Sequence, residues 1–529
     1  MGKYEDTKKK YVISVDAGTT GVRSLIVDLK GKTVGLAYKE NPLEFPSAGL
    51  CECPGEAIEE GIIYTTKKAV EESGIDPNEI GGVSFTFMRS SFFLRKNDGS
   101  FARKCIMWQD LRAAERFPWM REQLAKKGMT PEDYYAKTAF PLEGSVLPNN
   151  KIYWVKEHEP EVFEDTDVIH SVHALVAHVF GVEGFIDDKE DIGWFGIHDA
   201  DTMEYAPEIA EIFGVSVDKY AKMVPTGTVI GHVTKEAAEK MGLVEGIPII
   251  AGLGDHQCAA IGLGNNHEGL ASLVLGTAGV LVGHSSKPVR DPKCSAWVVG
   301  TPFDGQYELE CHSNAAASSY RWLRDAIMNE AVALTNATDQ KIDVYDIMSA
   351  IAGKAEPGCN GLIYLPWNAG AACPHYDPNA RGGFVGFTFA HGRPEITRSV
   401  MEGVAYDIRD MWELEIKAGL PEFDVLRLSG GAARSPLWCQ IVADVLNTVV
   451  ETVENEEATA LGAAMVATVG AGLYPNLQQA IDNMVHVTGR YEPIPENVEK
   501  YNQLYQIFTD TYEALKEKTF PGIAKFQGF

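Results

Sequence analysis

A glycine-rich turn near the start of the chain carries a carboxylate, two hydroxyls and a guanidinium. It reads D-A-G-T-T-G-V-R and contains Asp16, Gly18, Thr19, Thr20 and Arg23. Glycines let a hairpin expose its backbone N–H groups, which can cradle phosphate oxygens. Asp16 is suited to holding a hydrated Mg²⁺ next to them. A hairpin with favoured turn residues is the simpler alternative, but the chain has no P-loop pattern that would compete for a nucleotide.

A second carboxylate, Asp255, stands in the segment G-L-G-D-H-Q. This segment ends a predicted buried strand over 247–253, so Asp255 lies at a strand terminus where a helix begins. A carboxylate at such a place can accept the proton of a hydroxyl. The alternative is that Asp255 is the N-cap of the helix. A dinucleotide fingerprint is disfavoured, because its third glycine would fall at Gln257.

A third segment, S-G-G-A-A-R-S-P, follows a predicted strand over 425–428. Gly430 and Gly431 would let the backbone approach a flat ligand such as adenine, and the alternative is an ordinary strand-to-helix turn. Ser435 and Pro436 are typical of the N-cap and first position of a helix. A helix with a small-residue face is predicted for the segment that starts at Glu457.

Side chains suited to binding a polyol follow two strands in the first half. Arg89, Trp108, Gln109 and Asp110 supply a guanidinium, an aromatic wall, an amide and a carboxylate. A core position with a satisfied N–H is an equal alternative for Trp108. The histidines are scattered without the spacing of metal ligands, so Asp16 is the only metal ligand that we predict.

The elements that must position these residues follow an α/β pattern. A strand is predicted over 11–15, and a second one follows the glycine turn and runs through Asp28. Further strands are predicted over 33–38, 80–87 and 92–96. Amphipathic helices are predicted over 110–126, 171–180 and 502–518. This alternation indicates a layered α/β architecture.

The second half starts with the same kind of element as the first. Residues 270–284 read as strand, glycine turn and strand, and the turn contains Gly276 and Thr277. The segment L-G-T-A-G-V echoes D-A-G-T-T-G-V. We therefore expect two similar domains that face each other across a cleft, each contributing a glycine hairpin to it.

Length and charge limit the classes of protein that fit. A chain of 529 residues exceeds what one hydrophobic core supports, so two domains are expected, over 1–260 and 261–529. The formal net charge of −27 disfavours nucleic acid as a partner.

Cellular location is read from the cysteines and the apolar segments. The nine cysteines show no C-x-x-C pair, and neither a secretory signal nor a stretch of membrane-spanning length is recognised. We expect a cytoplasmic protein without a membrane partner. The oligomeric state stays open, with a homodimer as one candidate.

Taken together, six segments in order resemble the FGGY family of carbohydrate kinases. They are D-A-G-T-T-G at Asp16, M-W-Q-D-L-R at Met107, G-L-G-D-H-Q at Gly252, Y-D-P-N-A-R-G-G-F-V-G at Tyr376, S-G-G-A-A-R-S-P-L-W at Ser429 and E-A-T-A-L-G-A-A at Glu457. The resemblance runs from about Tyr11 to Tyr474. It implies two ribonuclease H-like domains of the actin, hexokinase and Hsp70 ATPase type, facing each other across a catalytic cleft.

The resemblance also implies roles for individual residues, with ATP and Mg²⁺ as cofactors and a small sugar or polyol as acceptor. Asp255 would be the catalytic base and Asp16 would help to place Mg²⁺. Thr19, Thr20, Arg23, Gly276 and Thr277 would surround the phosphates, together with Gly18. Gly430, Gly431 and Arg434 would lie near the nucleoside. The acceptor would contact Arg89, Trp108, Gln109, Asp110, Asp255 and His256.

The acceptor within the family is harder to read from the sequence. A ketopentose such as xylulose is the first choice, although xylulose kinases usually carry Met-His-Gly where this chain has Met88-Arg89-Ser90. Autoinducer-2 kinases, which resemble this chain in having Met-Arg, and glycerol or tetritol kinases are alternatives. Outside the sugar kinases, two alternatives stay open: a non-kinase ATPase of the same fold, which would not need the W-Q-D-L-R segment together with Asp255, and a dinucleotide oxidoreductase.

Overall fold

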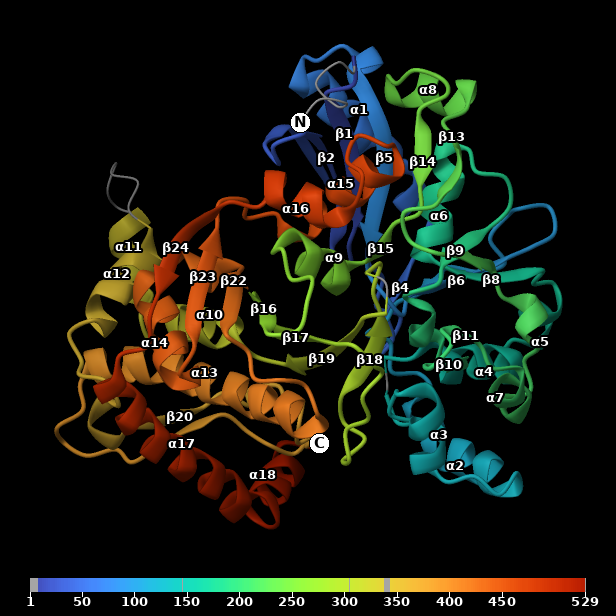
Figure 1. Ribbon diagram of the computed structural model, residues 1–529. Helices are drawn as coiled ribbons and strands as arrows, with labels where there is room; N and C mark the ends of the chain where they lie inside the picture. Colours follow the sequence, from blue (N-terminus) through green and yellow to red (C-terminus); the bar gives the residue numbers. More distant parts are fainter. Residues whose placement is uncertain (1–7, 145, 304, 337–342, 529) are drawn as a thin grey trace.

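The first of two large sheets is built entirely from the first half of the chain. The computed structural model describes residues 8–144, 146–303, 305–336 and 343–528 (Figure 1). The strands of this sheet, in spatial order, are β13 (Val229–His232), β14 (Pro248–Ile250), β5 (Ile80–Phe87), β1 (Tyr11–Ala17), β2 (Gly21–Asp28) and β3 (Thr33–Glu40), with β15 (Leu253–Gly254) beside β5.

Strand β1 shows why this sheet is covered on both faces. Successive side chains of a strand point to opposite faces. Ile13 and Val15 therefore join the core under α1 (Gly55–Ser73), whereas Val12 joins the core under α15 (Ala458–Gly470). On the same face, the hydroxyl of Ser14 donates to the carbonyl of Ala460 over 2.7 Å. A helix from the second half thus covers the sheet of the first half.

The second large sheet is built from residues 270–491. Its strands, in spatial order, are β18 (Trp297–Gly300), β19 (Tyr307–Ser313), β17 (Gly279–Ser285), β16 (Leu270–Leu275), β22 (Val425–Ser429), β23 (Val449–Val453) and β24 (Val487–Tyr491). The main hydrophobic core lies between this sheet and the helices α10 (Ala317–Ala326), α13 (Arg393–Ala418), α14 (Pro436–Leu446) and α17 (Pro495–Lys516).

The two sheets share one topology, which the sequence echo predicted. The order β3-β2-β1-β5-β14 in the first sheet corresponds to β19-β17-β16-β22-β23 in the second. In each sheet a glycine hairpin of antiparallel strands is followed by a strand parallel to its first member. The predicted hairpins over 11–28 and 270–284 are confirmed.

Helices α9 (Asp255–Gly262) and α15 cross at close range between the sheets. A Cβ atom at Gly262 would lie 1.8 Å from the carbonyl oxygen of Ala458, and one at Gly462 would lie 1.9 Å from that of Cys258. Only glycine permits this approach of backbone to backbone. The small-residue face predicted after Glu457 therefore serves the contact between α15 and α9.

A smaller region of short elements lies beside the first sheet. It includes a sheet of β4 (Glu52–Cys53), β7 (Cys105–Ile106), β6 (Phe92–Arg95) and β8 (Val168–Ser171), with helices α2 (Phe117–Lys126), α3 (Pro131–Thr138), α4 (Pro148–His158) and α6 (Val172–Phe180) around it. The helix predicted over 110–126 was too long at its start. Asp110 caps a turn there by accepting from the backbone of Arg112, and α2 begins only at Phe117.

Candidate functional site

Asp16 lies at the end of β1, recessed in the space between the two sheets. In the pairing of β1 with β2 it stands opposite Arg23, and the Gly18 N–H donates to the carbonyl of Gly21 over 3.1 Å to close the turn. Burial raises the pKa of Asp16 to about 7; Arg23 opposes this shift and Asp255 adds to it. A carboxylate that is costly to ionise alone gains from a nearby cation, so Asp16 fits a magnesium site.

The tip of this hairpin contacts the predicted acceptor wall. The indole N–H of Trp108 donates to the hydroxyl of Thr19 over 2.8 Å. Asn41 supports the turn from the other side, because its amide donates to the carbonyls of Gly18 and Thr19 over 3.0 and 3.2 Å. Thr20 is exposed. The structure therefore brings together two segments that lie about 90 residues apart in the chain.

Each of the two arginines predicted to contact the nucleotide forms an ion pair with one of two consecutive glutamates. Arg23 pairs with Glu457, which directly precedes α15, and Arg434 pairs with Glu456. Both pairs are partly exposed to solvent. Such pairs are weak, so either guanidinium can be redirected by a stronger anion. The phosphate role of Arg23 and the place of Arg434 near the nucleoside stay predictions.

The predicted nucleoside loop lies against the second hairpin. Gly430 has a φ of +89°, and a Cβ atom there would lie 2.6 Å from the carbonyl oxygen of Leu275, the residue before Gly276. A Cβ at Gly431 would meet nothing within 4 Å. The carbonyls of Gly276 and Thr277 accept from backbone N–H groups at the start of α10. The open approach to Gly431 and the exposed side chain of Thr277 suit a flat ligand carrying phosphates.

Asp255 is the first residue of α9, and Gly254 occupies the N-cap. The alternative that Asp255 is itself the N-cap is therefore wrong. A helix N-terminus stabilises a negative charge, and the Asp255 side chain keeps a third of its surface exposed. A Cβ at Gly254 would lie 2.5 Å from Arg89 Cδ and 2.8 Å from Asp191 Oδ1. Glycine is thus needed before Asp255 for the neighbouring side chains to close around it.

Arg89 forms an ion pair with Asp255, and every nitrogen of its guanidinium contacts a protein group. Its Nε lies 3.2 Å from Asp255 Oδ1, while Nη1 and Nη2 form a bidentate pair with Glu310 over 2.6 and 2.8 Å. Nη2 also contacts Nδ1 of His256, and Nη1 lies 3.4 Å from the side-chain oxygen of Gln257. Burial alone would lower the pKa of Arg89, but Glu310 outweighs it and raises that pKa.

Sequence reasoning missed Glu310 and two further neighbours of Arg89. The guanidinium lies 4.2 Å from the ring centroid of Trp194, and that ring stacks on Trp297 of β18 at 5.0 Å. Asp191 is buried next to this group, and its Oδ1 has no hydrogen-bond partner among the described residues. Burial and the neighbouring Asp188 raise the pKa of Asp191 well above its ordinary value. No local pattern signals these residues, because Glu310 lies 221 positions from Arg89.

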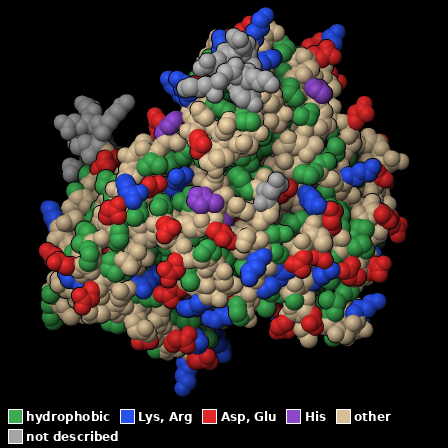
Figure 2. Space-filling view, in the orientation of Figure 1, with side chains coloured by type: hydrophobic (Ala, Val, Ile, Leu, Met, Phe, Trp, Pro, Cys, Tyr) green, Lys and Arg blue, Asp and Glu red, His purple; other side chains and the backbone are tan. Residues whose placement is uncertain are grey.

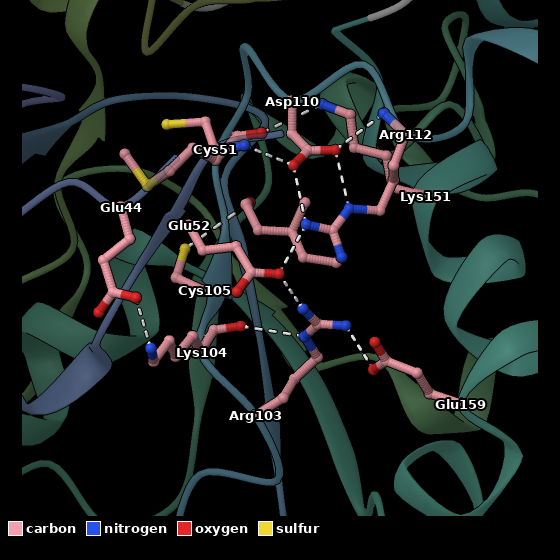
Figure 3. Close-up of polar contacts among 12 residues, drawn as sticks. Glu44, Cys51, Glu52, Arg103, Lys104, Cys105, Asp110, Arg112, Lys151 and Glu159 are labelled. Atoms are coloured by element: carbon pink, nitrogen blue, oxygen red, sulfur yellow. Dashed lines mark hydrogen bonds and ion pairs between the residues drawn. The ribbon is translucent and has the colours of Figure 1, made fainter. Parts of the chain in front are cut away.

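The acceptor segment after β7 divides into exposed and buried parts. Trp108 is 37% exposed, whereas Asp110 is 0% exposed and accepts from Arg112 and from the Cys51 N–H (Figure 3). The amide of Gln109 donates to the sulfur of Cys51 over 3.3 Å. The carboxylate of Asp110 thus supports the loop through a strong bidentate pair with Arg112. Its contact with the acceptor stays a prediction.

Lys151 of α4 anchors the same loop. Its ammonium donates to the carbonyls of Trp108, Val146 and Met107 over 2.6, 3.2 and 3.3 Å, and the side chain is buried. Burial lowers the pKa of Lys151 to about 7, and the Asp110 charge opposes that shift. Three carbonyls that converge on one buried amine hold the backbone of Trp108 in place.

We expect Lys151→Met to raise the KM for the acceptor about tenfold, because three buried carbonyls lose their donor and the Trp108 loop loosens. Steady-state kinetics with the acceptor and with ATP, alongside thermal unfolding, measure the effect. Lys156→Met on the same helix is the control, since Lys156 is exposed and contacts the Gly214 carbonyl and the Phe163 ring, away from the Trp108 loop. Equal acceptor KM values in the two variants would show that Lys151 does not hold the loop.

Two searches of the described residues bear on metal ions and membranes. They reveal no group of three or more His, Cys, Asp or Glu side chains placed to hold a metal ion. Within the same residues, no helix is long and apolar enough to cross a membrane. On the face seen in Figure 2, acidic and basic side chains are interspersed.

Comparisons with known proteins cover nearly the whole chain. The family described as "FGGY family of carbohydrate kinases" matches with its N-terminal domain over residues 11–262 and with its C-terminal domain over residues 271–471. A xylulose kinase of Bacillus subtilis (strain 168) is 29% identical over 510 residues, which cover 96% of this chain and 98% of the relative. A gluconokinase of the same strain is 26% identical and covers 98% of both chains. A solved xylulose kinase from Lactobacillus acidophilus superposes with a TM-score of 0.86 at 23% identity, over 96% of this chain and 99% of that one.

Proposed function

Because this chain belongs to the FGGY family of carbohydrate kinases and is an ATP-dependent sugar kinase, we propose that it phosphorylates xylulose with Asp255 as the base. One observation carries the assignment of the base. Asp255 presents a partly exposed carboxylate at the N-terminus of α9, directly held by Arg89 at 3.2 Å. That carboxylate can take the proton of an attacking hydroxyl as the phosphoryl group is transferred.

Arg89 prepares Asp255 for this step. The ion pair through Nε limits the rotation of the carboxylate, so that one oxygen stays available to the substrate. The bidentate contact with Glu310 fixes the guanidinium in turn. Positioning of this kind supplies much of the rate in phosphoryl transfer, since the reaction needs little covalent help from the protein.

We assign the nucleotide to the two glycine hairpins and the Gly430 loop. Thr19, Thr20 and Thr277 would donate to the phosphates, next to Gly18 and Gly276, whose own N–H groups close the two turns. Gly431 leaves space for the adenine. Asp16 would hold Mg²⁺, whose charge would neutralise the phosphates when it is bound. The high pKa of Asp16 supports this assignment, because a cation relieves the cost of its burial.

The choice of xylulose is supported by the relatives and by the composition of the pocket. A relative that aligns over 96% of the chain is a xylulose kinase. Trp108 offers an apolar wall at the cleft, and the unpaired oxygen of Asp191 offers a partner for a hydroxyl. Arg89 in place of the usual histidine still provides nitrogen atoms next to Asp255. A cytoplasmic location is part of the proposal, and the nine free cysteines suit a reducing compartment.

A coupled assay of ADP release tests the acceptor directly. We expect D-xylulose to give the largest kcat/KM in a panel that also contains D-gluconate, glycerol and 4,5-dihydroxy-2,3-pentanedione. ADP release without any acceptor gives the background of ATP hydrolysis. A larger kcat/KM for another member of the panel would replace xylulose as the acceptor while leaving the kinase activity intact.

A further inference from the structure

The pair of Arg89 and Glu310 joins the two halves of the molecule across the acceptor pocket. Arg89 follows β5 of the first sheet, and Glu310 lies on β19 of the second. Both side chains are 5% exposed, and both guanidinium Nη atoms contact the carboxylate, over 2.6 and 2.8 Å. Although burial would raise it, the charge of Arg89 holds the pKa of Glu310 down to about 2. The buried guanidinium of Arg89 thus stabilises the charged form of Glu310.

This pairing leaves no part of the Arg89 charge for a ligand. Each nitrogen of the guanidinium already contacts a protein acceptor: Nε meets Asp255, Nη1 meets Glu310 and Gln257, and Nη2 meets Glu310 and His256. An arginine that is to bind a substrate carboxylate must present its paired N–H groups to the pocket. Here those groups face β19.

The balance of charge around the pocket is consequently negative. One guanidinium faces two carboxylates, those of Glu310 and Asp255. Two further cations of the first half are engaged elsewhere, because Lys151 donates to backbone carbonyls and Arg112 pairs with Asp110. A ligand that brings its own carboxylate would therefore meet like charges in a poorly solvated site, which weakens its binding.

From this arrangement we infer that Glu310 is a specificity-determining residue that reserves the acceptor pocket for neutral sugars and excludes sugar acids. The inference rests on the proposed sugar kinase function and narrows its substrate class. The distinction also exists among the relatives, because one is named a kinase of a neutral ketose and another a kinase of a sugar acid. Neutral hydroxyls can still donate to Asp255 and to the unpaired oxygen of Asp191.

The test is the variant Glu310→Gln, which keeps an acceptor oxygen for Arg89 and removes the charge. We expect the ratio of kcat/KM for D-gluconate to that for D-xylulose to rise about 10- to 100-fold, because the freed guanidinium can pair with the acid. Glu310→Asp retains the charge and should leave the ratio near that of the natural protein.

Glu308→Gln is the matched control. Glu308 lies two residues before Glu310 on the same face of β19 and is fully buried, with one carboxylate oxygen 3.5 Å from Nε2 of His284. Burial and the nearby Glu310 raise the pKa of Glu308 well above its ordinary value, so the substitution changes little charge. The gluconate-to-xylulose ratio should be unchanged in this variant.

The outcomes separate this inference from the proposed function. An unchanged ratio in a folded Glu310→Gln variant, or equal use of both sugars by the natural protein, overturns the role of Glu310. If the natural protein phosphorylates neither sugar, xylulose is not its acceptor. Calorimetric titration with D-gluconate then tests the role of Glu310 by itself, and tighter binding to Glu310→Gln than to the natural protein supports the inference. Should Glu310→Gln not fold, the pair Glu310→Asn and Glu310→Asp makes the same comparison of charge.

Discussion

Asp255→Asn should lower kcat for the sugar by about 10²- to 10⁴-fold, the largest effect that we expect from any single change in this protein. The amide has the size of the carboxylate and keeps an oxygen for the Nε of Arg89, which contacts Asp255 Oδ1 over 3.2 Å. It cannot accept the proton of the attacking hydroxyl. Steady-state ADP release with saturating ATP and sugar measures the loss.

The same variant should bind ATP normally, because the predicted nucleotide segments lie on the hairpins and the Gly430 loop. Calorimetric binding of a nonhydrolysable ATP analogue and a thermal unfolding curve provide the controls. Turnover within a few-fold of the natural protein, in a variant that folds and binds the analogue, would remove Asp255 from the role of base.

Arg89→Ala should lower kcat/KM for the sugar by about 10²- to 10³-fold and leave the KM for ATP nearly unchanged. Asp255 would lose the group that orients it, and Glu310 would be left buried without its cation. Removing one partner of a buried ion pair costs about 3–5 kcal/mol, so the variant should also unfold at a lower temperature. Kinetics and calorimetric unfolding of the variant measure the two effects separately.

A double-mutant cycle with Glu310 tells orientation apart from stability. Adding Glu310→Gln to Arg89→Ala removes the unpaired charge, so the unfolding temperature should recover by a good part of the loss. Turnover should not recover, since nothing then holds Asp255. If turnover returns together with stability, Arg89 acts on the fold alone. If the KM for ATP rises and that for the sugar does not, Arg89 belongs to the nucleotide side of the cleft and not to the acceptor pocket.

The local elements and the family were readable from the sequence because their signals are local. The hairpin at Gly18, the N-cap at Ser435 and the helix after Ser171 are all found where their turn residues and caps predict. These features depend on backbone preferences over a few residues. The order of six motifs identified the FGGY family, and with it the kinase activity and the fold.

The sequence does not show the contacts of residues whose partners lie far along the chain. The sequence predicts a contact between Asp110 and the acceptor, but its carboxylate is engaged by Arg112 and the Cys51 N–H. It also predicts that Arg89 contacts the acceptor, whereas the structure directs its two Nη atoms to Glu310. A list of residue types cannot show which polar group has already satisfied another.

The sequence alone therefore determined the two hairpins and the family, and it predicts which carboxylates do the chemistry. Tertiary structure decided the electrostatics of the acceptor pocket. Arg89 and Glu310 stand 221 positions apart, one after β5 of the first sheet and one on β19 of the second, and they meet only in the folded chain. The energy of a charge pair depends on distance and burial, and neither quantity is encoded in the spacing of two residues along the chain.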